Sequence, residues 1–275
     1  MTFAQTRFAS RHFLPETPPQ LQGPAQWIVR GANFVVAYGI LPEGTTIVRD
    51  DVQESICYLP DGGGTFSAGG AQVDCGSDAS VVIVPPGKSQ LTMTREARVL
   101  RLFSISAQDL AALAVNADVY ADGAAEVMPP VPWPAPFTGF ALRHYRTSDY
   151  RERPMRMFRS ANLMINIFDF DGPRDIAALS PHSHADFEQC SFGMTGQWVH
   201  SLRYPWSRNL NDWKEDEHLQ IGSPSVLVIP ATVIHTSRST APGNNQLVDI
   251  FCPPRRDFCE MGLVCNADEY PVPPA

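Results

Sequence analysis

Four residues of metal-ligand type lie in the second half of the chain, with spacings that could bring them to one point. His182 and His184 are separated by one residue, so on an extended strand both imidazoles would project from the same face. Glu188 follows after a corner, and His235 follows far downstream, beyond the apolar run Ser225–Ile229 and a turn. A β-barrel could place His235 opposite the other three. Three neutral imidazole nitrogens and one carboxylate suit a divalent transition metal, and on an octahedral ion they leave two positions for water, oxygen or substrate.

Aromatic and basic residues after this group could bind a substrate. An arginine fork can hold a carboxylate, and a tryptophan can stack on a planar group. The alternative is a solvated loop with a packed aromatic residue, which we prefer for Glu215–Glu217, whereas for Arg203 the two interpretations are balanced. The candidate substrate residues are His200, Arg203, Tyr204 and Trp206.

Short apolar runs rich in Val, Ile, Phe and Leu, bounded by Gly, Pro, Asn or Asp, must position these side chains. Their spacing predicts an all-β chain built as a sandwich or barrel, and it does not match alternating βαβ units. The predicted strands are Trp27–Val29, Asn33–Ile40, Ser55–Leu59, Ser80–Val84 and Val99–Ser104, then Leu163–Phe170, Gln189–Phe192, Trp198–Arg203, Ser225–Ile229 and Gln246–Phe251.

One short helix and one linker separate the two sets of strands. Ser106 is a candidate N-cap, Asp109 has the spacing of a capping box, and Leu110–Val115 supply an apolar face. The proline-dense segment 129–136 can continue neither a helix nor a central strand, so we expect a stiff linker there. The predicted division is an N-terminal barrel over residues 1–128, a linker over 129–137 and a C-terminal barrel over 138–275.

The two halves repeat the same landmarks, which indicates an internal duplication. Glu188 precedes Gly196 by eight residues, and Glu54 precedes Gly62 by the same number. A second landmark is also repeated: a predicted strand is followed by a proline, and the residue of interest lies five positions after it. These residues are Pro230 and His235 in the second half, and Pro85 and Gln90 in the first. Two matched landmarks in the same order favour duplication.

The first half has lost the ligand residues at the matching positions. With Glu54 aligned to Glu188, Val48 and Asp50 stand in place of the paired histidines, and Gln90 replaces the last one. Valine cannot bind a metal, so we expect no transition metal in this half. Its role is then that of a structural barrel, of a dimerisation surface that would make a homodimer, or of a lid over the other half.

These motifs resemble those of the cupin superfamily, and the two halves together resemble a bicupin. The first cupin motif, HxH followed by Glu and Gly, corresponds to His182, His184, Glu188 and Gly196; the second, PxGxxH, ends at His235, with Thr232 in place of Gly. The resemblance covers Trp27–Ser104 and Leu163–Phe251. It implies two double-stranded β-helix (jelly-roll) barrels with few short helices, and metal ligands at His182, His184, Glu188 and His235.

Composition limits the other classes of function. The net charge is −8 and only two of the 21 basic residues are lysines, so no basic patch indicates a nucleic-acid or anionic-membrane partner. No apolar run approaches a membrane span, and the six cysteines form no CxxC pair, which favours reduced, mostly buried thiols. We therefore expect a cytoplasmic protein.

Two classes of function fit the site. The first is a metal-dependent enzyme that acts on a small polar organic acid or a sugar-like compound, with oxygenase-type chemistry favoured over isomerase, hydrolase or lyase chemistry. The second is a non-catalytic binding or sensing module with a structural metal. In both cases one divalent transition metal per chain is expected, Fe or Mn before Zn or Ni.

Overall fold

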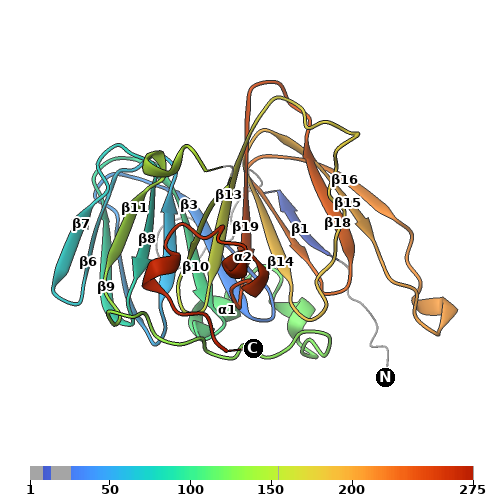
Figure 1. Ribbon diagram of the computed structural model, residues 1–275, viewed down its shortest axis with the longest axis horizontal. Helices are drawn as coiled ribbons and strands as arrows, with labels where there is room; N and C mark the ends of the chain where they lie inside the picture. The colour runs from blue at the N-terminus through green and yellow to red at the C-terminus, as the bar shows by residue number, and fades with distance from the viewer. Residues whose placement is uncertain (1–8, 14–25, 154, 275) are drawn as a thin grey trace. The chain divides into compact units, whose positions relative to one another are not determined.

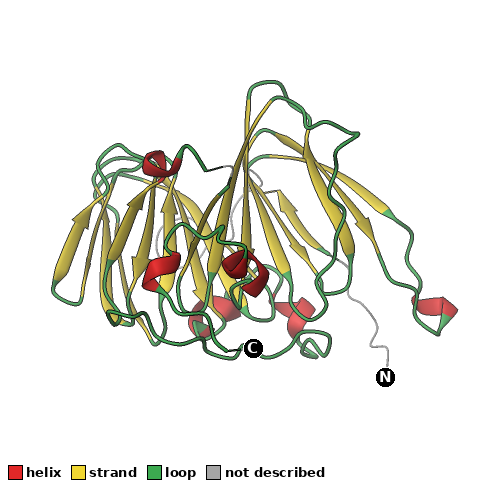
Figure 2. Ribbon diagram, in the orientation of Figure 1, coloured by secondary structure: helices red, strands yellow, loops and turns green. Residues whose placement is uncertain are grey.

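The structure is a computed structural model that describes residues 9–13, 26–153 and 155–274, and strands make up most of its regular secondary structure (Figure 2). The two α-helices, α1 (Gln108–Ala112) and α2 (Arg256–Glu260), have five residues each. The predicted all-β class is therefore confirmed. Single 3-10 turns cover Ala117–Tyr120, Thr147–Tyr150, Leu210–Asp212 and Ala267–Glu269.

The described chain divides into two compact units. Unit 1 comprises residues 9–13, 120–129 and 167–251, and unit 2 comprises residues 26–119, 130–166 and 252–274, apart from residue 154. Each unit thus draws on separated stretches of the chain, unlike the sequential division expected around the linker 129–137. Residues 129–137 contain neither helix nor strand, as expected from their prolines. Whether the chain separates into two folding domains at this linker stays a prediction.

Unit 2 contains two antiparallel sheets (Figure 1). Side chains from both sheets meet in one apolar core, which includes Leu59, Val82 and Val99 from one sheet and Phe66 and Leu91 from the other. The first sheet has the order β11-β8-β5-β10-β3-β2, with β2 (Trp27–Arg30), β3 (Phe34–Leu41), β5 (Ser55–Leu59), β8 (Ser80–Val84), β10 (Ala97–Ser104) and β11 (Arg143–Arg146). The second has the order β4-β9-β6-β7, with β4 (Thr46–Asp51), β6 (Gly64–Ala68), β7 (Ala71–Asp74) and β9 (Gly87–Met93). The short strand β12 (Arg156–Arg159) also lies in unit 2.

Unit 1 repeats this architecture. Leu227 and Ile229 from one sheet pack with Leu202 and Leu219 from the other in a buried cluster. In the first sheet β1 (Ser10–Phe13), β17 (Ser225–Ile229), β14 (Gln189–Thr195), β19 (Asn244–Phe251) and β13 (Met164–Asp171) are neighbours in that order. The second sheet has the order β16-β15-β18, with β15 (Gln197–Arg203), β16 (Glu217–Gly222) and β18 (Ile234–Ser239).

The strands missed from the sequence are mostly those with one solvated face. In β4 the odd-numbered residues are partly buried and the even-numbered ones exposed, so this strand shows alternation instead of an apolar run. The predicted helix is also shorter than expected. It begins after Ala107 without a side-chain cap, and the Ser106 hydroxyl hydrogen-bonds with Ser104 (2.6 Å). Ser106 is therefore not the N-cap.

All six cysteines are free thiols, as expected, and four of them are buried: Cys57, Cys75, Cys190 and Cys252. Burial raises the pKa of Cys252 to about 12, so this thiol stays protonated at neutral pH. Among the described residues no helix is long and apolar enough to cross a membrane.

Candidate metal centre

Two segments of unit 1 carry the three histidines. His235 lies near the start of β18, and its backbone exchanges two hydrogen bonds with His182, at 3.1 and 2.8 Å. The backbone N–H of Thr232 donates to the carbonyl of His184 (2.6 Å). The spacing of His182 and His184 predicted a strand. The segment is instead an extended stretch with one β-bridge to His235.

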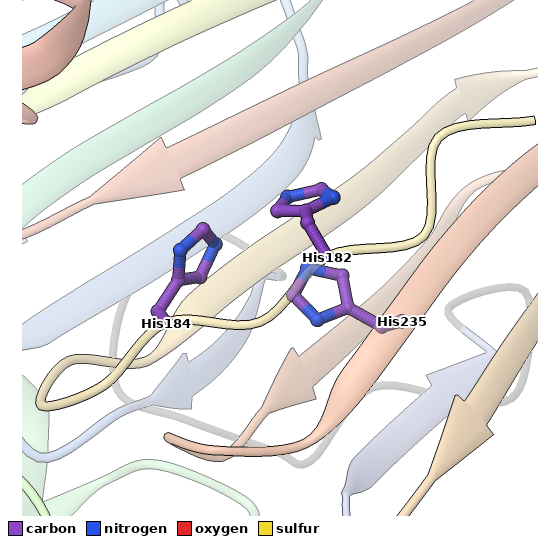
Figure 3. A group of neighbouring side chains, drawn as sticks. All are labelled: His182, His184 and His235. Atoms are coloured by element: carbon purple, nitrogen blue, oxygen red, sulfur yellow. The ribbon is translucent and has the colours of Figure 1, made fainter.

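The three imidazoles converge (Figure 3). One ring nitrogen from each of His182, His184 and His235 lies within 4.8 Å of the others. The ring centroids of His182 and His235 are 4.5 Å apart, and those of His184 and His235 are 5.2 Å apart. His184 and His235 are buried, whereas His182 is exposed. The group therefore has two ligands inside the unit and one at its solvent edge.

Hydrogen bonds determine which nitrogens of two rings can bind a metal. Nδ1 of His235 lies 2.9 Å from the carbonyl oxygen of Val233, and Nδ1 of His182 lies 2.9 Å from that of Ser180. A carbonyl oxygen only accepts, so each Nδ1 carries the proton. In the neutral tautomer the lone pair is then on Nε2, and such an orienting bond is what metal-binding histidines ordinarily make.

Gln189, which the sequence analysis did not single out, lies directly against this group. Its Oε1 is 3.0 Å from Nε2 of His184 and 3.2 Å from Nε2 of His235. Its Nε2 donates to the Ser191 hydroxyl (2.9 Å), which in turn donates to Asp249 (2.7 Å). The amide oxygen is therefore held toward the imidazoles.

The donor set fits a cation. Gln189 Oε1 and the unprotonated Nε2 of His235 are both acceptors, and a proton donor or a positive ion between them removes their repulsion. Two ligands at about 2.1 Å from one ion are roughly 3.0–3.4 Å apart at right or tetrahedral angles, which matches the 3.0 and 3.2 Å separations. The residues present therefore fit a divalent transition metal.

Glu188, the expected fourth ligand, is not one of the residues in this group. It is buried, and its carboxylate accepts a hydrogen bond from the Tyr120 hydroxyl (3.0 Å). In unit 2 the matching Glu54 likewise accepts from a tyrosine hydroxyl, that of Tyr270 (2.9 Å). The Gln189 amide oxygen lies against two of the imidazoles. That Glu188 is a fourth ligand of the same ion stays a prediction.

The candidate substrate residues lie in different environments. His200 is buried, and its Nδ1 lies 2.7 Å from the Ser237 hydroxyl. Burial, with a smaller contribution from His235, lowers the pKa of His200 to about 4, so this ring is neutral at pH 7. Tyr204 is buried too, and its hydroxyl donates to Glu217 (2.9 Å).

Arg203 and Trp206 lie at the surface. Arg203 is exposed and forms an ion pair with Asp216 (2.6 Å), so its fork already holds a carboxylate. Trp206 is 71% exposed and stacks on Trp213, with ring centroids 4.2 Å apart and planes within 5°. The sequence places Trp213 in the insertion between the two motifs, but no pattern in it indicates that this loop folds back onto Trp206.

A surface cleft lies next to the histidine group. One part of it is lined by His235, His218, Arg203, Asp216 and Ile234. The adjoining part shares the last three residues and is lined further by Trp206 and Trp213. Of the three converging histidines His235 borders this cleft, whose lining includes the exposed residues Arg203, His218 and Ile234.

In unit 2, the residues aligned with the three histidines are exposed: Val48, Asp50 and Gln90. Val48 pairs with Gln90 in the β4–β9 ladder, as His182 pairs with His235. Arg49 and Ser89, one residue along each strand, line an interior cavity that Gln90 also borders. The alignment therefore gives the right strands but the wrong face, because a shift of one residue turns a side chain to the other side of a sheet.

No protein-family model matches the chain, and no curated protein matches it in sequence. Solved structures do match. An oxalate decarboxylase from Lactobacillus farciminis, in complex with formate, has 12% identity and a TM-score of 0.60 over 92% of this chain and 88% of its own. AerE from Microcystis aeruginosa has 7% identity and a TM-score of 0.57 over 91% of this chain and 100% of its own.

An IolB-like protein from Salmonella typhimurium has 12% identity and a TM-score of 0.56, over 91% of this chain and 94% of its own. Together with the paired antiparallel sheets of each unit, these likenesses support the resemblance that the histidine motifs suggested. The chain therefore has the jelly-roll fold of these solved structures.

Proposed function

We propose that this protein is a metal-dependent enzyme that acts on a small polar organic acid or a sugar-like compound. The observation that carries the proposal is the convergence of three histidine nitrogens, with the Gln189 amide oxygen against two of the rings. His182, His184 and His235 would hold one divalent transition metal, Fe or Mn before Zn or Ni. When bound, such an ion supplies Lewis acidity or oxygen activation.

The protein groups around the ion would orient the substrate. Nδ1 of His235 and Nδ1 of His182 are tied to carbonyl oxygens, which would keep both rings aimed at one point. The tryptophan pair in the outer cleft offers a flat apolar wall. The charge of Arg203 is matched by Asp216, so a substrate carboxylate would bind the ion more readily than this arginine.

The second candidate is a non-catalytic binding or sensing module whose metal is structural. A structural site is closed by protein ligands, whereas a catalytic site keeps an open position. The exposure of His182 and the cleft at His235 favour the open kind. A small carboxylic acid as substrate is further supported by the likeness to an oxalate decarboxylase.

The test begins with the metal content of protein purified without a histidine tag, for wild type and for His235→Ala. We expect about one transition-metal ion per wild-type chain and almost none in the variant. The loaded protein is then incubated with small organic acids and sugars while oxygen uptake, carbon dioxide release and substrate loss are followed. Turnover that disappears in His235→Ala supports the enzyme, and oxygen uptake identifies oxygenase chemistry. Saturable ligand binding without turnover would instead establish the binding module, and equal metal content in both proteins would refute the site.

A further inference from the structure

The interior of unit 2 contains a cavity of about 30 Å³ that the proposed function does not use. This is larger than the roughly 10–15 Å³ that one water molecule needs. Arg101, on β10, lines the cavity and is only 7% exposed. The other lining residues are Ile47, Arg49, Ser55, Ile56, Cys57, Phe66, Val84, Ser89, Gln90, Leu91 and Phe103.

The groups in contact with Arg101 are uncharged. Its guanidinium donates to the side-chain oxygen of Gln26 and lies 5.6 Å from the centre of the Phe103 ring. Cys57 is its partner in the β5–β10 ladder, and burial raises the pKa of that thiol, which keeps it protonated. Within the described part of the chain, no carboxylate hydrogen-bonds to Arg101. A guanidinium stays charged in proteins, and a buried charge without a counter-ion is costly.

The nearest acidic residues are held by another arginine. Arg49 forms ion pairs with Asp51 (2.6 Å) and Asp109 (2.5 Å), and it uses both terminal nitrogens to do so. These two carboxylates attract the charge of Arg101 electrostatically, but their hydrogen bonds are made with Arg49. Among the described residues, the Arg101 guanidinium hydrogen-bonds to Gln26 alone, so its remaining N–H groups can bind a ligand in the cavity.

The comparison with unit 1 shows that the charge at this point of the barrel is reversed. In unit 2 Arg101 pairs with Cys57, on the strand that begins at Ser55. In unit 1 Asp249 pairs with Ser191, on the strand that begins at Gln189. Cys57 and Ser191 are each the third residue of their strand, so the two pairs occupy equivalent positions. Asp249 is linked to the candidate metal ligands through Ser191 and Gln189, whereas Arg101 lies in unit 2, where Val48, Asp50 and Gln90 replace the three converging histidines.

We propose that the interior of unit 2 is an anion site that binds a small monocarboxylate of about the size of acetate on Arg101. Guanidinium forks match the two oxygens of a carboxylate. The Ser55 and Ser89 side chains line the same cavity and can donate to those oxygens, while Phe66 and Leu91 offer an apolar wall for a short hydrocarbon part. The small volume excludes a large ligand.

The experiment measures the melting temperature of the full-length protein in sodium acetate from 1 to 100 mM, with sodium chloride keeping the ionic strength constant. If acetate binds the folded state with a dissociation constant below 1 mM, the melting temperature of wild type rises by about 5–10 °C across this range. Arg101→Met fills a similar volume without the charge, and we expect it to fold and to show no rise. Arg98→Met is the matched control, because Arg98 is on the same strand but pairs with Asp61. It should respond to acetate as wild type does.

A second pair of variants tests the site from the opposite strand. Cys57→Asp puts a carboxylate in register with Arg101, which should occupy the site and abolish the response to acetate, whereas Cys57→Ser should keep it. A wild type that responds equally to acetate and chloride would overturn the proposal. So would an Arg101→Met protein that acetate stabilises as much as wild type. Metal content is measured in parallel, so that a failed anion site is distinguished from a failed metal site.

Discussion

The sharpest prediction concerns two adjacent residues, because the motif names Glu188 as a metal ligand whereas the structure places the Gln189 amide oxygen against two imidazoles. Gln189→Met keeps the length of the side chain and removes the amide oxygen that lies 3.0 and 3.2 Å from two imidazoles. Glu188→Gln keeps the shape and removes the charge of a carboxylate that accepts from Tyr120. The structure predicts that the first change weakens metal binding and that the second does not.

The expected magnitudes follow from the contacts. Loss of a group that ligates a metal, or orients its ligands, typically weakens binding about 10–100-fold, which is about 1.4–2.7 kcal/mol. Glu188→Gln should leave metal affinity within about threefold. It should lower the free energy of unfolding by about 1 kcal/mol, because a hydrogen bond to a buried charged acceptor becomes a neutral one.

The assay is a competition titration of the metal-free proteins with a chromophoric chelator, with Co²⁺ or Zn²⁺, alongside urea unfolding of the same samples. His235→Ala serves as the reference for a lost site. If Glu188→Gln lowered affinity more than tenfold while Gln189→Met bound the ion as wild type does, the motif-based ligand set would be right. The orientation argued here for the start of β14 would then be refuted.

Three further predictions follow from the backbone and from charge. Gly196 has a φ of +91°, and a Cβ there would lie 2.0 Å from the Asn245 side-chain oxygen, so Gly196→Ala should lower the free energy of unfolding by more than about 2 kcal/mol in urea; an unchanged midpoint would contradict this. Thr232 has a φ of 70°, and Thr232→Gly should remove about 1–2 kcal/mol of backbone strain while adding about 0.5–1 kcal/mol of backbone entropy cost. The free energy of unfolding in urea should therefore rise by about 0.5–1 kcal/mol in Thr232→Gly but not in Thr232→Ala. Arg98, chiefly by its hydrogen bonds, lowers the pKa of Asp61. The pair should add under about 1 kcal/mol to the free energy of unfolding above pH 4, and this contribution should disappear as the pH falls through the lowered pKa. Urea unfolding of wild type and Arg98→Met at about pH 2–7 measures this difference.

The sequence by itself indicated the class of the fold and the three histidines that converge. Apolar runs such as Ser80–Val84 and Ser225–Ile229 are strands buried on both faces, and a local pattern is enough to identify them. The histidines could be found because their spacing within two short motifs is visible without knowledge of the tertiary structure. The duplication was equally visible, since it repeats residues at equal intervals.

The tertiary structure alone decided which side chains face inward. That the Gln189 side chain lies against the imidazoles, and that Arg49 rather than Val48 lines the interior of unit 2, depends on strand register, in which a shift of one residue reverses every side chain. The sequence likewise did not reveal contacts between distant residues. Asp216 forms an ion pair with Arg203, Tyr120 donates a hydrogen bond to Glu188, and Trp213 stacks on Trp206. The physical reason is the same in each case, because hydrogen bonds and stacking depend on distances that folding sets between segments, and no local spacing encodes them.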